Sequence, residues 1–373
     1  MTMDIEEIIR LIAAPFDLTP LSPEVVVYGA GNTGCEVGAF LHAAGHRVAA
    51  YLDAAARPHQ QLHGVPVQRP SDWTERHPTA GMDVVVAIHN FEVDMVEALA
   101  QVRRLEFRRT LNMIDFHNLF PNWQPFRYWL APRVFYCGHE REIEEAFLLL
   151  GDETSRLWYR EVLAFRLSGD YSRLPSPSLE DQYVPRDLPR WKNPMRLIDC
   201  GAYDGDTIEA LAGANYSFEA IAAFEPEPQN FKALAARARR YGLAVCFPCG
   251  VADGTRMVRF LAGAGMGSRE AADGNAFIQC VALDEALAGF HPTHIKMDIE
   301  GAEPDALAGA RRMIEDDLPT LAIALYHQPD HLWRIPLIIA GWKVGYRMEI
   351  RGHAFGSFDT VLYAFHGNGH GHE

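Results

Sequence analysis

The amino-acid sequence predicts an α/β fold with two doubly wound sheets joined by a helical middle segment. Two observations support this prediction. Short apolar runs alternate with helix-forming stretches in each half of the chain, and each series opens with a strand followed by a glycine-bearing turn. The length of 373 residues is typical of two or three domains. Both sheets are therefore expected to be Rossmann-like, and the expected segments are 1–120, 121–192, 193–366 and 367–373.

The first segment, 1–120, has the pattern of a parallel sheet with helices on its faces. Its apolar runs predict strands at 24–30, 46–53 and 82–90, and a helix from about Asn32 to Ala44. We expect a Rossmann-like domain of the nucleotide-binding type.

The middle segment, 121–192, is rich in aromatic residues and then in apolar residues spaced by three and four. This spacing predicts two helices. The stretch from 173 to 191 contains several prolines, which cannot continue a helix, so it is expected to be a connector, ordered or partly mobile.

The third segment, 193–366, repeats the α/β alternation with at least five strands and ends in a hairpin-like return. The region 255–282 is expected to be irregular, and the Gly- and His-rich tail 367–373 is expected to be disordered. The predicted strands of this segment are MRLIDCGA, AIAAFEP, AVCFPCGVA, HIKMDIEG, LAIALYH and FDTVLYAF. Two of its predicted helices are NFKALAARARRYG and PDALAGARRMI.

Charge and composition exclude several classes of function. Lys and Arg number 34 against 49 Asp and Glu, a net charge of −15, which disfavours nucleic acid and anionic membranes as partners. No apolar run reaches the roughly 18 residues of a membrane span, and the N-terminus carries acids where a secretory signal carries Lys or Arg. The six scattered cysteines fit a reducing compartment. We therefore expect a cytoplasmic protein.

The first glycine turn follows the strand at 24–30 and matches the dinucleotide fingerprint through Gly29, Gly31 and Gly34. Asp53 lies 19 residues further on, at the end of the next predicted strand, where a carboxylate holds ribose hydroxyls. This predicts a site for a nucleotide or a nucleotide-linked sugar. The alternative is that the turn only closes the sheet and the domain supports assembly.

The second glycine turn follows the strand at 195–200 and is acidic. Asp199, Asp204 and Asp206 surround Gly201 and Gly205. A pyrophosphate would meet like charge there, whereas a ligand with an ammonium and a sulfonium would meet opposite charge. The alternative is that Asp204 and Asp206 only cap the following helix.

Glu225 ends the next predicted strand, 24 residues after Gly201, and suits the two hydroxyls of a ribose. An adenosine with a positively charged tail satisfies both positions. The cofactor predicted for this half of the chain is therefore S-adenosylmethionine.

Five sequence blocks between about 193 and 366 resemble the FkbM family of S-adenosylmethionine-dependent methyltransferases. In order they are LIDCGAYDGDTIEAL, AFEPEPQNFKAL, HIKMDIEGAEPDALAGA, LAIALYHQPDHLWRIP and FDTVLYAF. The resemblance implies a Rossmann-like methyltransferase domain, O-methylation, and a sugar or polyketide-derived hydroxyl as acceptor. It further implies that Glu225 is the acid that binds the ribose, flanked by Phe224 and Pro226. The loop on the methionine side would consist of Asp199, Gly201, Asp204, Gly205 and Asp206.

A second resemblance concerns the N-terminal segment. Its YGAGNTG turn and its GVPV stretch at 64–67 are similar to the nucleotide-sugar-binding N-terminal domains of some sugar acyltransferases.

Methyl transfer to a hydroxyl needs a base beside an aligned acceptor. His327, Asp298 and Glu300 end predicted strands at the carboxyl edge, where ligands of such sheets bind. A neutral imidazole titrates near working pH, so His327 is the first choice for the base, with Asp298 to orient it or to replace it. The alternatives are an Asp298–Lys296 ion pair, a helix cap by Glu300 and a buried structural His327; His353 is a weaker candidate base.

A divalent metal is compatible with Asp298, Glu300 and His327 as ligands, although their spacing does not require one. Cys246 and Cys249 are expected to be small buried residues near the adenine rather than a zinc site.

The leading functional hypothesis is an S-adenosylmethionine-dependent O-methyltransferase acting on a sugar or other small-molecule hydroxyl. The alternatives are an NAD- or nucleotide-sugar-dependent enzyme that uses the N-terminal domain, and a non-catalytic ligand-binding protein. A homodimer through the middle helices is a further expectation. Four tryptophans are candidates to stack on a sugar ring or to lie in the core; they are Trp123, Trp129, Trp158 and Trp333.

Overall fold

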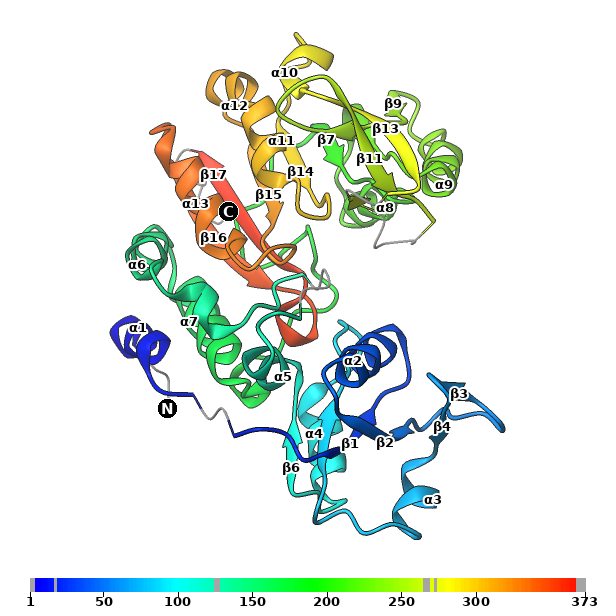
Figure 1. Cartoon of the computed structure of the whole chain (residues 1–373). Helices are drawn as coiled ribbons and strands as arrows, with labels where there is room; N and C mark the ends of the chain where they lie inside the picture. Colours follow the sequence, from blue (N-terminus) through cyan, green and yellow to red (C-terminus); the bar gives the residue numbers. More distant parts are fainter. Residues whose placement is uncertain (1–3, 17–18, 124–127, 264–268, 272–273, 367–373) are drawn as a thin grey trace. The chain divides into compact units, whose positions relative to one another are not determined.

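The structure is a computed structural model that describes residues 4–16, 19–123, 128–263, 269–271 and 274–366 (Figure 1). The tail expected at 367–373 lies outside the described residues.

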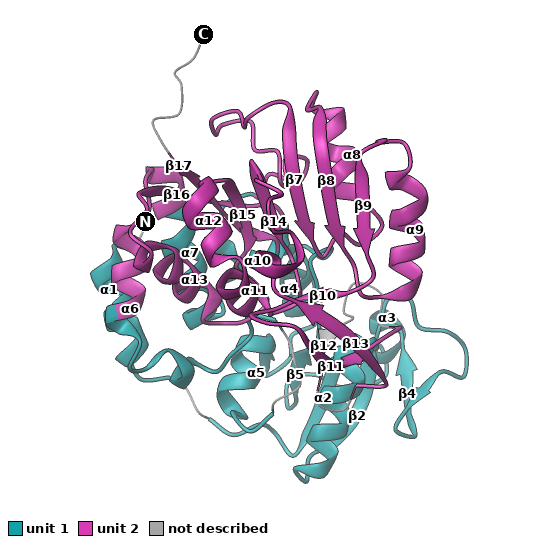
Figure 2. Cartoon of the chain, turned by 90° about the horizontal axis from the view of Figure 1, so that it is seen from above, with its two compact units in different colours: residues 1–141, 157–176, 354–358 teal, residues 142–156, 177–353, 359–373 magenta. Residues whose placement is uncertain are grey.

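The chain divides into two compact units, each built from separate stretches of sequence (Figure 2). Unit 1 comprises residues 1–141, 157–176 and 354–358, and unit 2 comprises residues 142–156, 177–353 and 359–373. The division therefore does not follow the boundaries at 120 and 192 that the sequence suggests. The middle segment is shared between the two units.

Unit 1 contains a six-stranded sheet in the order β3-β4-β2-β1-β5-β6. The β1 strand pairs in parallel with β2 on one side and with β5 on the other, so the strand order reverses beside β1. Its strands are β1 (Glu24–Tyr28), β2 (Arg47–Leu52), β3 (Gln61–Leu62), β4 (Val65–Gln68), β5 (Asp83–Val86) and β6 (Arg109–Leu111). The strands predicted at 24–30, 46–53 and 82–90 are confirmed as β1, β2 and β5.

The helices α2 and α4 follow β1 and β5 directly in the chain, as expected for crossover helices of a parallel sheet. The helices of the N-terminal part are α1 (Ile5–Ala13), α2 (Asn32–Ala43), α3 (Pro70–Thr74), α4 (Met95–Arg103) and α5 (Met113–Leu119), with the short 3₁₀ helix η1 (Arg133–Tyr136) after them. The middle segment forms α6 (Glu140–Leu148), α7 (Glu153–Ser168) and η2 (Tyr171–Arg173). The two helices predicted for that segment are therefore present as α6 and α7.

Unit 2 contains a seven-stranded sheet in the order β16-β17-β15-β14-β7-β8-β9. Six strands share one direction, whereas β17 is antiparallel to both of its neighbours, β15 and β16, as the predicted return requires. The strands are β7 (Met195–Cys200), β8 (Phe218–Phe224), β9 (Ala244–Phe247), β14 (His294–Met297), β15 (Thr320–Ala324), β16 (Tyr346–Gly352) and β17 (Thr360–His366). The β7 strand lies between β8 and β14, so the order reverses at β7.

The region 255–282 differs from the irregular excursion that the sequence suggests. It contributes three strands to a small second sheet in the order β10-β13-β11-β12. The three strands are β11 (Arg256–Leu261), β12 (Arg269–Glu270) and β13 (Ala276–Val281), and the fourth strand of the sheet, β10 (Gly250–Val251), precedes the region. The β11 strand alternates buried and exposed side chains, with Val258 and Phe260 facing inward, which is the period-2 pattern of a half-buried strand.

The helices of unit 2 connect the parallel strands of the large sheet. They are α8 (Asp206–Gly213), α9 (Pro228–Ala238), α10 (Leu283–Ala286), α11 (Glu303–Gly309), α12 (Arg311–Asp317) and α13 (His331–Gly341), and the 3₁₀ helix η4 (Phe355–Ser357) precedes β17 in the chain. The single helix predicted at 304–314 is two short helices that meet at Ala310.

Two further findings concern membranes and thiols. Among the residues that the structure describes, none of the helices is both long and apolar enough to cross a membrane. All six cysteines are free thiols.

Candidate active site

The glycine turn after β7 brings the carboxyl ends of β7 and β14 into close contact. Gly201 has a φ of +73°, and a Cβ at this position would lie 1.8 Å from the backbone oxygen of Asp298. Gly205, with a φ of +90°, caps the N-terminus of α8. Only glycine fits both requirements at Gly201 without moving β14. The turn therefore lies where the strand order of the sheet reverses, which is where doubly wound sheets bind ligands.

The carboxylates of this turn are partly neutralised by cations of the protein, which the sequence does not reveal. Asp199 lies 3.1 Å from Lys296 Nζ, and its side chain is fully buried. Asp204 forms two hydrogen bonds with the guanidinium of Arg237, at 2.8 and 2.9 Å. The argument that three free anions face a ligand is thus corrected: two of the three already have a cationic partner.

Lys296 is a cross-strand neighbour of Asp199 and also donates to the backbone oxygen of Gly201 at 2.5 Å. Burial would lower the pKa of Lys296, but the carboxylates of Asp199 and Asp298 raise it above its ordinary value. The ion pair of Lys296 is therefore with Asp199, whereas the alternative weighed from the sequence paired it with Asp298; the Asp199–Lys296 pair links β14 to β7. Because Asp206 and Asp298 also surround the ammonium, this edge of the sheet keeps an excess of negative charge.

Glu225, at the end of β8, holds the glycine turn in place. Its carboxylate accepts hydrogen bonds from the backbone N–H of Tyr203 at 3.0 Å and of Glu227 at 2.8 Å. Burial raises the pKa of Glu225 to about 7, and these two N–H donors oppose that rise. Each carboxylate oxygen has a second lone pair, so Glu225 can accept further hydrogen bonds from a ligand. Pro226 follows it at the same edge, and Phe224 stacks on Phe247 of β9 with ring centroids 4.6 Å apart.

Four residues at the ends of β14 and β15 form a cluster that we call the His327 cluster: Asp298, Glu300, Glu303 and His327. His327 Nε2 lies 3.2 Å from Asp298 Oδ1 and 3.8 Å from Glu300 Oε1. On the other side of the ring, Nδ1 lies 2.7 Å from Glu303 Oε1. The three predicted residues are therefore brought together, and Glu303 joins them.

The surroundings of His327 indicate an imidazolium rather than a neutral base. Burial would lower its pKa, but the carboxylates of Glu303 and Glu300 and the contact with Asp298 hold the pKa well above its ordinary value. Its side chain is fully buried, whereas those of Asp298 and Glu300 are 20% and 18% exposed. These carboxylate contacts favour the protonated ring, and the role of His327 as a base stays a prediction. The members of the cluster with exposed surface are carboxylates.

Sequence reasoning missed the groups that hold Asp298. The Tyr183 hydroxyl donates to Asp298 Oδ2 at 2.6 Å, and the Tyr326 hydroxyl donates to Oδ1 at 3.2 Å. His327, Lys296 and Tyr183 lower the pKa of Asp298 although burial acts to raise it. Tyr183 belongs to the proline-bearing connector, where no motif distinguishes it from its neighbours.

Sequence reasoning also did not identify Glu303 as a site residue, although it lies within the HIKMDIEGAE block. It is fully buried at the first position of α11, where it accepts from the backbone N–H of Ile299 at 2.8 Å. Its other oxygen lies 3.3 Å from His331 Nδ1, and burial lowers the pKa of His331 to about 4. A chain of contacts therefore runs from His331 through Glu303 and His327 to Asp298.

Left-handed backbone occurs at several non-glycine positions along the described chain, and some of them lie in this region. Four non-glycine residues near the turn and the His327 cluster have a left-handed φ, a conformation that costs free energy and often marks functional sites. They are Tyr183 (+60°), Tyr203 (+46°), Glu300 (+57°) and Asp359 (+45°).

The cluster also has the composition of a cation site. One ligand atom from each of Asp298, Glu303 and His327 lies within 4.8 Å of the others. A metal ion would need His327 neutral, with one ring nitrogen turned to the metal, whereas both nitrogens face carboxylates here. This arrangement fits a proton better than a metal.

Several weaker candidates have structural roles. His353 is buried between the backbone oxygen of Ser178 and the Tyr363 hydroxyl, each 2.9 Å away. Cys249 is buried, as predicted, whereas Cys246 on β9 is only partly buried, and their place near the adenine stays a prediction. The tryptophans considered for sugar stacking are all core residues with at most 5% exposure; they are Trp123, Trp129, Trp158 and Trp333.

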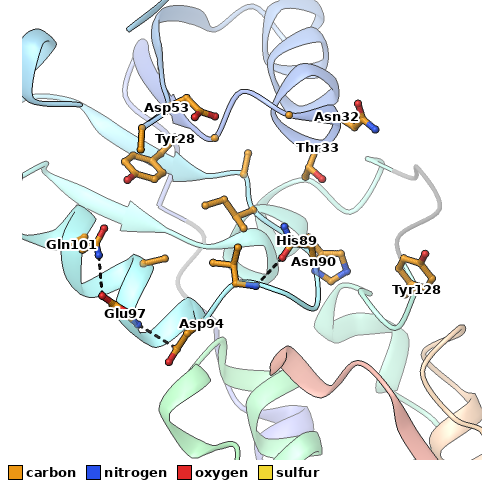
Figure 3. Close-up of a pocket in the computed structure, with 17 residues that line it drawn as sticks. Tyr28, Asn32, Thr33, Asp53, His89, Asn90, Asp94, Glu97, Gln101 and Tyr128 are labelled. Carbon is orange, nitrogen blue, oxygen red and sulfur yellow. Dashed lines mark hydrogen bonds between the residues drawn. The ribbon is translucent and has the colours of Figure 1, made fainter. Parts of the chain in front are cut away.

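In unit 1 the predicted nucleotide residues Gly29, Gly31, Gly34 and Asp53 also come together. Asp53 Oδ2 accepts from the backbone N–H of Ala30, inside the glycine turn, at 2.8 Å. Gly29, Gly31 and Asp53 line a pocket at the carboxyl ends of β1, β2 and β5 (Figure 3).

The reversed strand order, the glycine turn and the acids at the strand ends define unit 2 as a Rossmann-like ligand-binding domain with acid–base groups at its carboxyl edge. Residues 199–360 match the sequence model of the Methyltransferase FkbM domain. This part of the chain is therefore an FkbM methyltransferase domain, and the protein is an enzyme of the S-adenosylmethionine-dependent methyltransferase class.

A solved structure shares the fold. The crystal structure of Methyltransferase FkbM from Methylobacillus flagellatus KT is similar to this chain with a TM-score of 0.78 and 23% identity, over 96% of this chain and 93% of that chain. Fibrillarin from Aeropyrum pernix, in complex with natively bound S-adenosyl-L-methionine, matches with a TM-score of 0.31 and 12% identity, over 48% of this chain and 70% of that chain. No curated protein sequence matches the chain.

Proposed function

We propose that the protein is an S-adenosylmethionine-dependent O-methyltransferase that acts on a hydroxyl of a sugar or another small molecule. The observation that carries this proposal is the acidic carboxyl edge of the unit 2 sheet, where Glu225 and Asp298 flank the glycine turn after β7. Nucleic acid and membranes stay outside the proposal because the chain carries a net charge of −15. We further propose a cytoplasmic location, and a homodimer stays a prediction.

The residues of this edge fit the chemical groups of S-adenosylmethionine. Glu225 keeps lone pairs for the two ribose hydroxyls, and Pro226 lies beside it. On the methionine side, Gly201 and Gly205 open the turn, while Asp204 is held by Arg237. The acids of the edge outnumber its two cations, Lys296 and His327, so the edge attracts an ammonium and a sulfonium; these acids are Asp199, Asp206, Asp298, Glu300 and Glu303.

Bound S-adenosylmethionine would supply a methyl group on a positively charged sulfur. In the transfer, the bond from carbon to sulfur breaks with its electron pair left on sulfur, and an oxygen–carbon bond forms. The acceptor oxygen must then lose its proton. Asp298 and Glu300 are the groups of the His327 cluster that an acceptor can reach, since their side chains are partly exposed.

Asp298 is our choice to take that proton, with His327 as a positioning residue. Its lowered pKa does not prevent this, because an oxygen that has gained a methyl group is a far stronger acid than a carboxylic acid. The imidazolium of His327 and the hydroxyls of Tyr183 and Tyr326 fix the carboxylate so that it meets the acceptor without rearrangement.

Calorimetric titration of the full chain with S-adenosylhomocysteine tests the proposal. We expect a dissociation constant on the order of micromolar and a much weaker one in Glu225→Gln. If neither S-adenosylmethionine nor S-adenosylhomocysteine binds at micromolar levels, the proposal is wrong.

The acceptor is then sought with methyl-labelled S-adenosylmethionine and a panel of sugars, glycosides and other hydroxylated small molecules. Transfer of label to a hydroxyl oxygen supports the proposal. Transfer only to nitrogen or carbon acceptors in a matched panel contradicts O-methylation while leaving the enzyme class unchanged.

A further inference from the structure

Unit 1 contains a pocket that the methyltransferase proposal does not use. Its volume is about 720 Å³. It lies beyond the carboxyl ends of β1 and β5, between which the strand order of the unit 1 sheet reverses. This is the position at which doubly wound sheets bind nucleotides.

The three glycines of the first turn each have the geometry of a dinucleotide fingerprint. Gly29 has a φ of +99° and makes the tight turn after β1. Gly34 lies against this turn, because a Cβ there would stand 2.0 Å from the backbone oxygen of Gly29. Gly31 has open space around its Cβ position and lines the pocket, so its backbone is accessible to a ligand. A turn that only closed the sheet would need the first two features and not the third.

The N-terminus of α2 provides the positive end of this pocket. The N-cap of this 12-residue helix is Gly31, which has no side chain to cap the first N–H groups. Asn32 and Thr33, its first residues, line the pocket (Figure 3). Backbone N–H groups at such a helix start bind phosphate.

Asp53 is positioned to hold a ribose on the other side of the turn. Its two carboxylate oxygens accept from the backbone N–H of Ala30 and of Ala55, both at 2.8 Å, so the carboxylate is fixed. Each oxygen retains a lone pair for one ribose hydroxyl. Asp53 borders the pocket beside Tyr28 (Figure 3).

The far wall of the pocket comes from the start of α4 and the segment before it. Asp94, Glu97, Gln101 and Asn90 line this wall, and none of the described lining residues is Lys or Arg (Figure 3). Acceptor groups of this kind suit hydroxyl or amide donors and disfavour further phosphate. The phosphates are therefore expected at α2 only.

We propose that the unit 1 pocket binds a nucleoside diphosphate that carries a polar, uncharged or cationic group. The diphosphate contacts the backbone at Gly31 and the first turn of α2, the ribose diol contacts Asp53, and the attached group faces α4. The site is separate from the proposed S-adenosylmethionine site and does not depend on it.

Calorimetric titrations of the full chain test this proposal, with UDP-glucose and NAD⁺ as probes. Both are run with saturating S-adenosylhomocysteine, so that nucleotide binding at the unit 2 turn is blocked. We expect at least one probe to bind with a dissociation constant below about 100 µM. UDP-glucose binding would identify a sugar as the attached group, and NAD⁺ binding would identify a nicotinamide.

The variant Gly31→Val places a side chain in the open space at the ligand-facing glycine. Its backbone φ of −80° is accessible to any residue, so the fold is expected to persist. The matched control is Gly81→Val, at an exposed glycine of unit 1 that also has open space at its Cβ position and does not line the pocket.

We expect Gly31→Val to weaken probe binding at least tenfold, while Gly81→Val leaves it unchanged and both variants bind S-adenosylhomocysteine like the wild type. The proposal is overturned if neither probe binds to the wild type at millimolar concentration. It is also overturned if Gly31→Val binds the probe as tightly as Gly81→Val does.

Discussion

The two glycine turns of this protein share one architecture and differ in charge. In each, an acid at the end of the neighbouring strand accepts a hydrogen bond from a backbone N–H of the turn: Asp53 from Ala30 in unit 1, and Glu225 from Tyr203 in unit 2. Each turn lies where its sheet reverses strand order, and each leads into a crossover helix. This shared backbone is the reason why we propose a nucleoside ligand at both positions.

The difference lies in the charged groups around each turn. The unit 2 turn has a buried Asp199–Lys296 pair and the neighbouring His327 cluster, whereas the unit 1 turn opens onto a helix N-terminus without a side-chain cap. The comparison teaches that the backbone sets where a ligand lies, and the charges set which ligand it is. We therefore propose a sulfonium ligand for the unit 2 turn and a diphosphate for the unit 1 turn.

The largest expected effect is on the rate of methyl transfer, which we assign to an acid of unit 2 and to none of unit 1. We expect Asp298→Asn to lower methyl transfer by about 10²- to 10⁴-fold, because the acceptor proton loses its carboxylate. Asp94→Asn in unit 1 should leave the rate unchanged, since Asn also caps α4. Rates with labelled S-adenosylmethionine and the acceptor found by screening give the answer; equal rates for the two variants would contradict the assignment of Asp298.

The next largest effect is expected on stability. Lys296→Met leaves Asp199 buried without its cation, and loss of one partner of a buried pair costs about 3–5 kcal/mol. Arg237→Met breaks the partly exposed pair with Asp204, which is worth about 1 kcal/mol or less. Urea unfolding of both variants measures the two costs. Similar losses would show that the unit 2 turn is not organised around Lys296.

A smaller effect is expected from pH, because burial raises the pKa of Glu225 to about 7. Below this pH the carboxyl gains a proton and no longer accepts both ribose hydroxyls, so S-adenosylhomocysteine affinity should rise with pH up to about 7 and then level off. The change is at most about tenfold per pH unit. Calorimetry from about pH 5.5 to 8 measures it. In Glu225→Gln the same profile should be flat; a wild-type profile already flat would exclude Glu225 from the ribose site.

The smallest effect is expected from chelation. Both ring nitrogens of His327 already face carboxylates, an arrangement that favours a proton on each nitrogen over a bond to a metal. Methyl transfer should therefore change by less than about twofold after EDTA treatment, as no interaction of the transition state is removed. A large loss that Mg²⁺ or Mn²⁺ restores would assign the cluster to a metal.

Sequence reasoning predicts the parts of this protein that follow from local patterns. The alternation of apolar runs predicts both large sheets, and the glycine spacing predicts both turns, because backbone geometry depends on a few neighbouring residues. Asp298, Glu300 and His327 are found together because strand ends meet at one edge of a parallel sheet.

The features that sequence reasoning could not predict depend on contacts between residues that are distant in the sequence. Arg237 is 33 positions from Asp204, and Tyr183 is 115 positions from Asp298, so neither partner is visible in the sequence. The raised pKa of His327 depends most on the carboxylate of Glu303, whose burial is a property of the folded chain. The small sheet at 250–281 was missed although β11 and β13 have six residues each; β10 and β12, with two residues each, are too short to show a pattern.

The central claim is that the turn in unit 2, and not the one in unit 1, holds the methyl donor. Its most direct test is calorimetry of S-adenosylhomocysteine with Glu225→Gln and with Gly31→Val. The account predicts one binding site per chain, weakened about tenfold or more by Glu225→Gln and unaffected by Gly31→Val. Binding that is lost in Gly31→Val and retained in Glu225→Gln would contradict it.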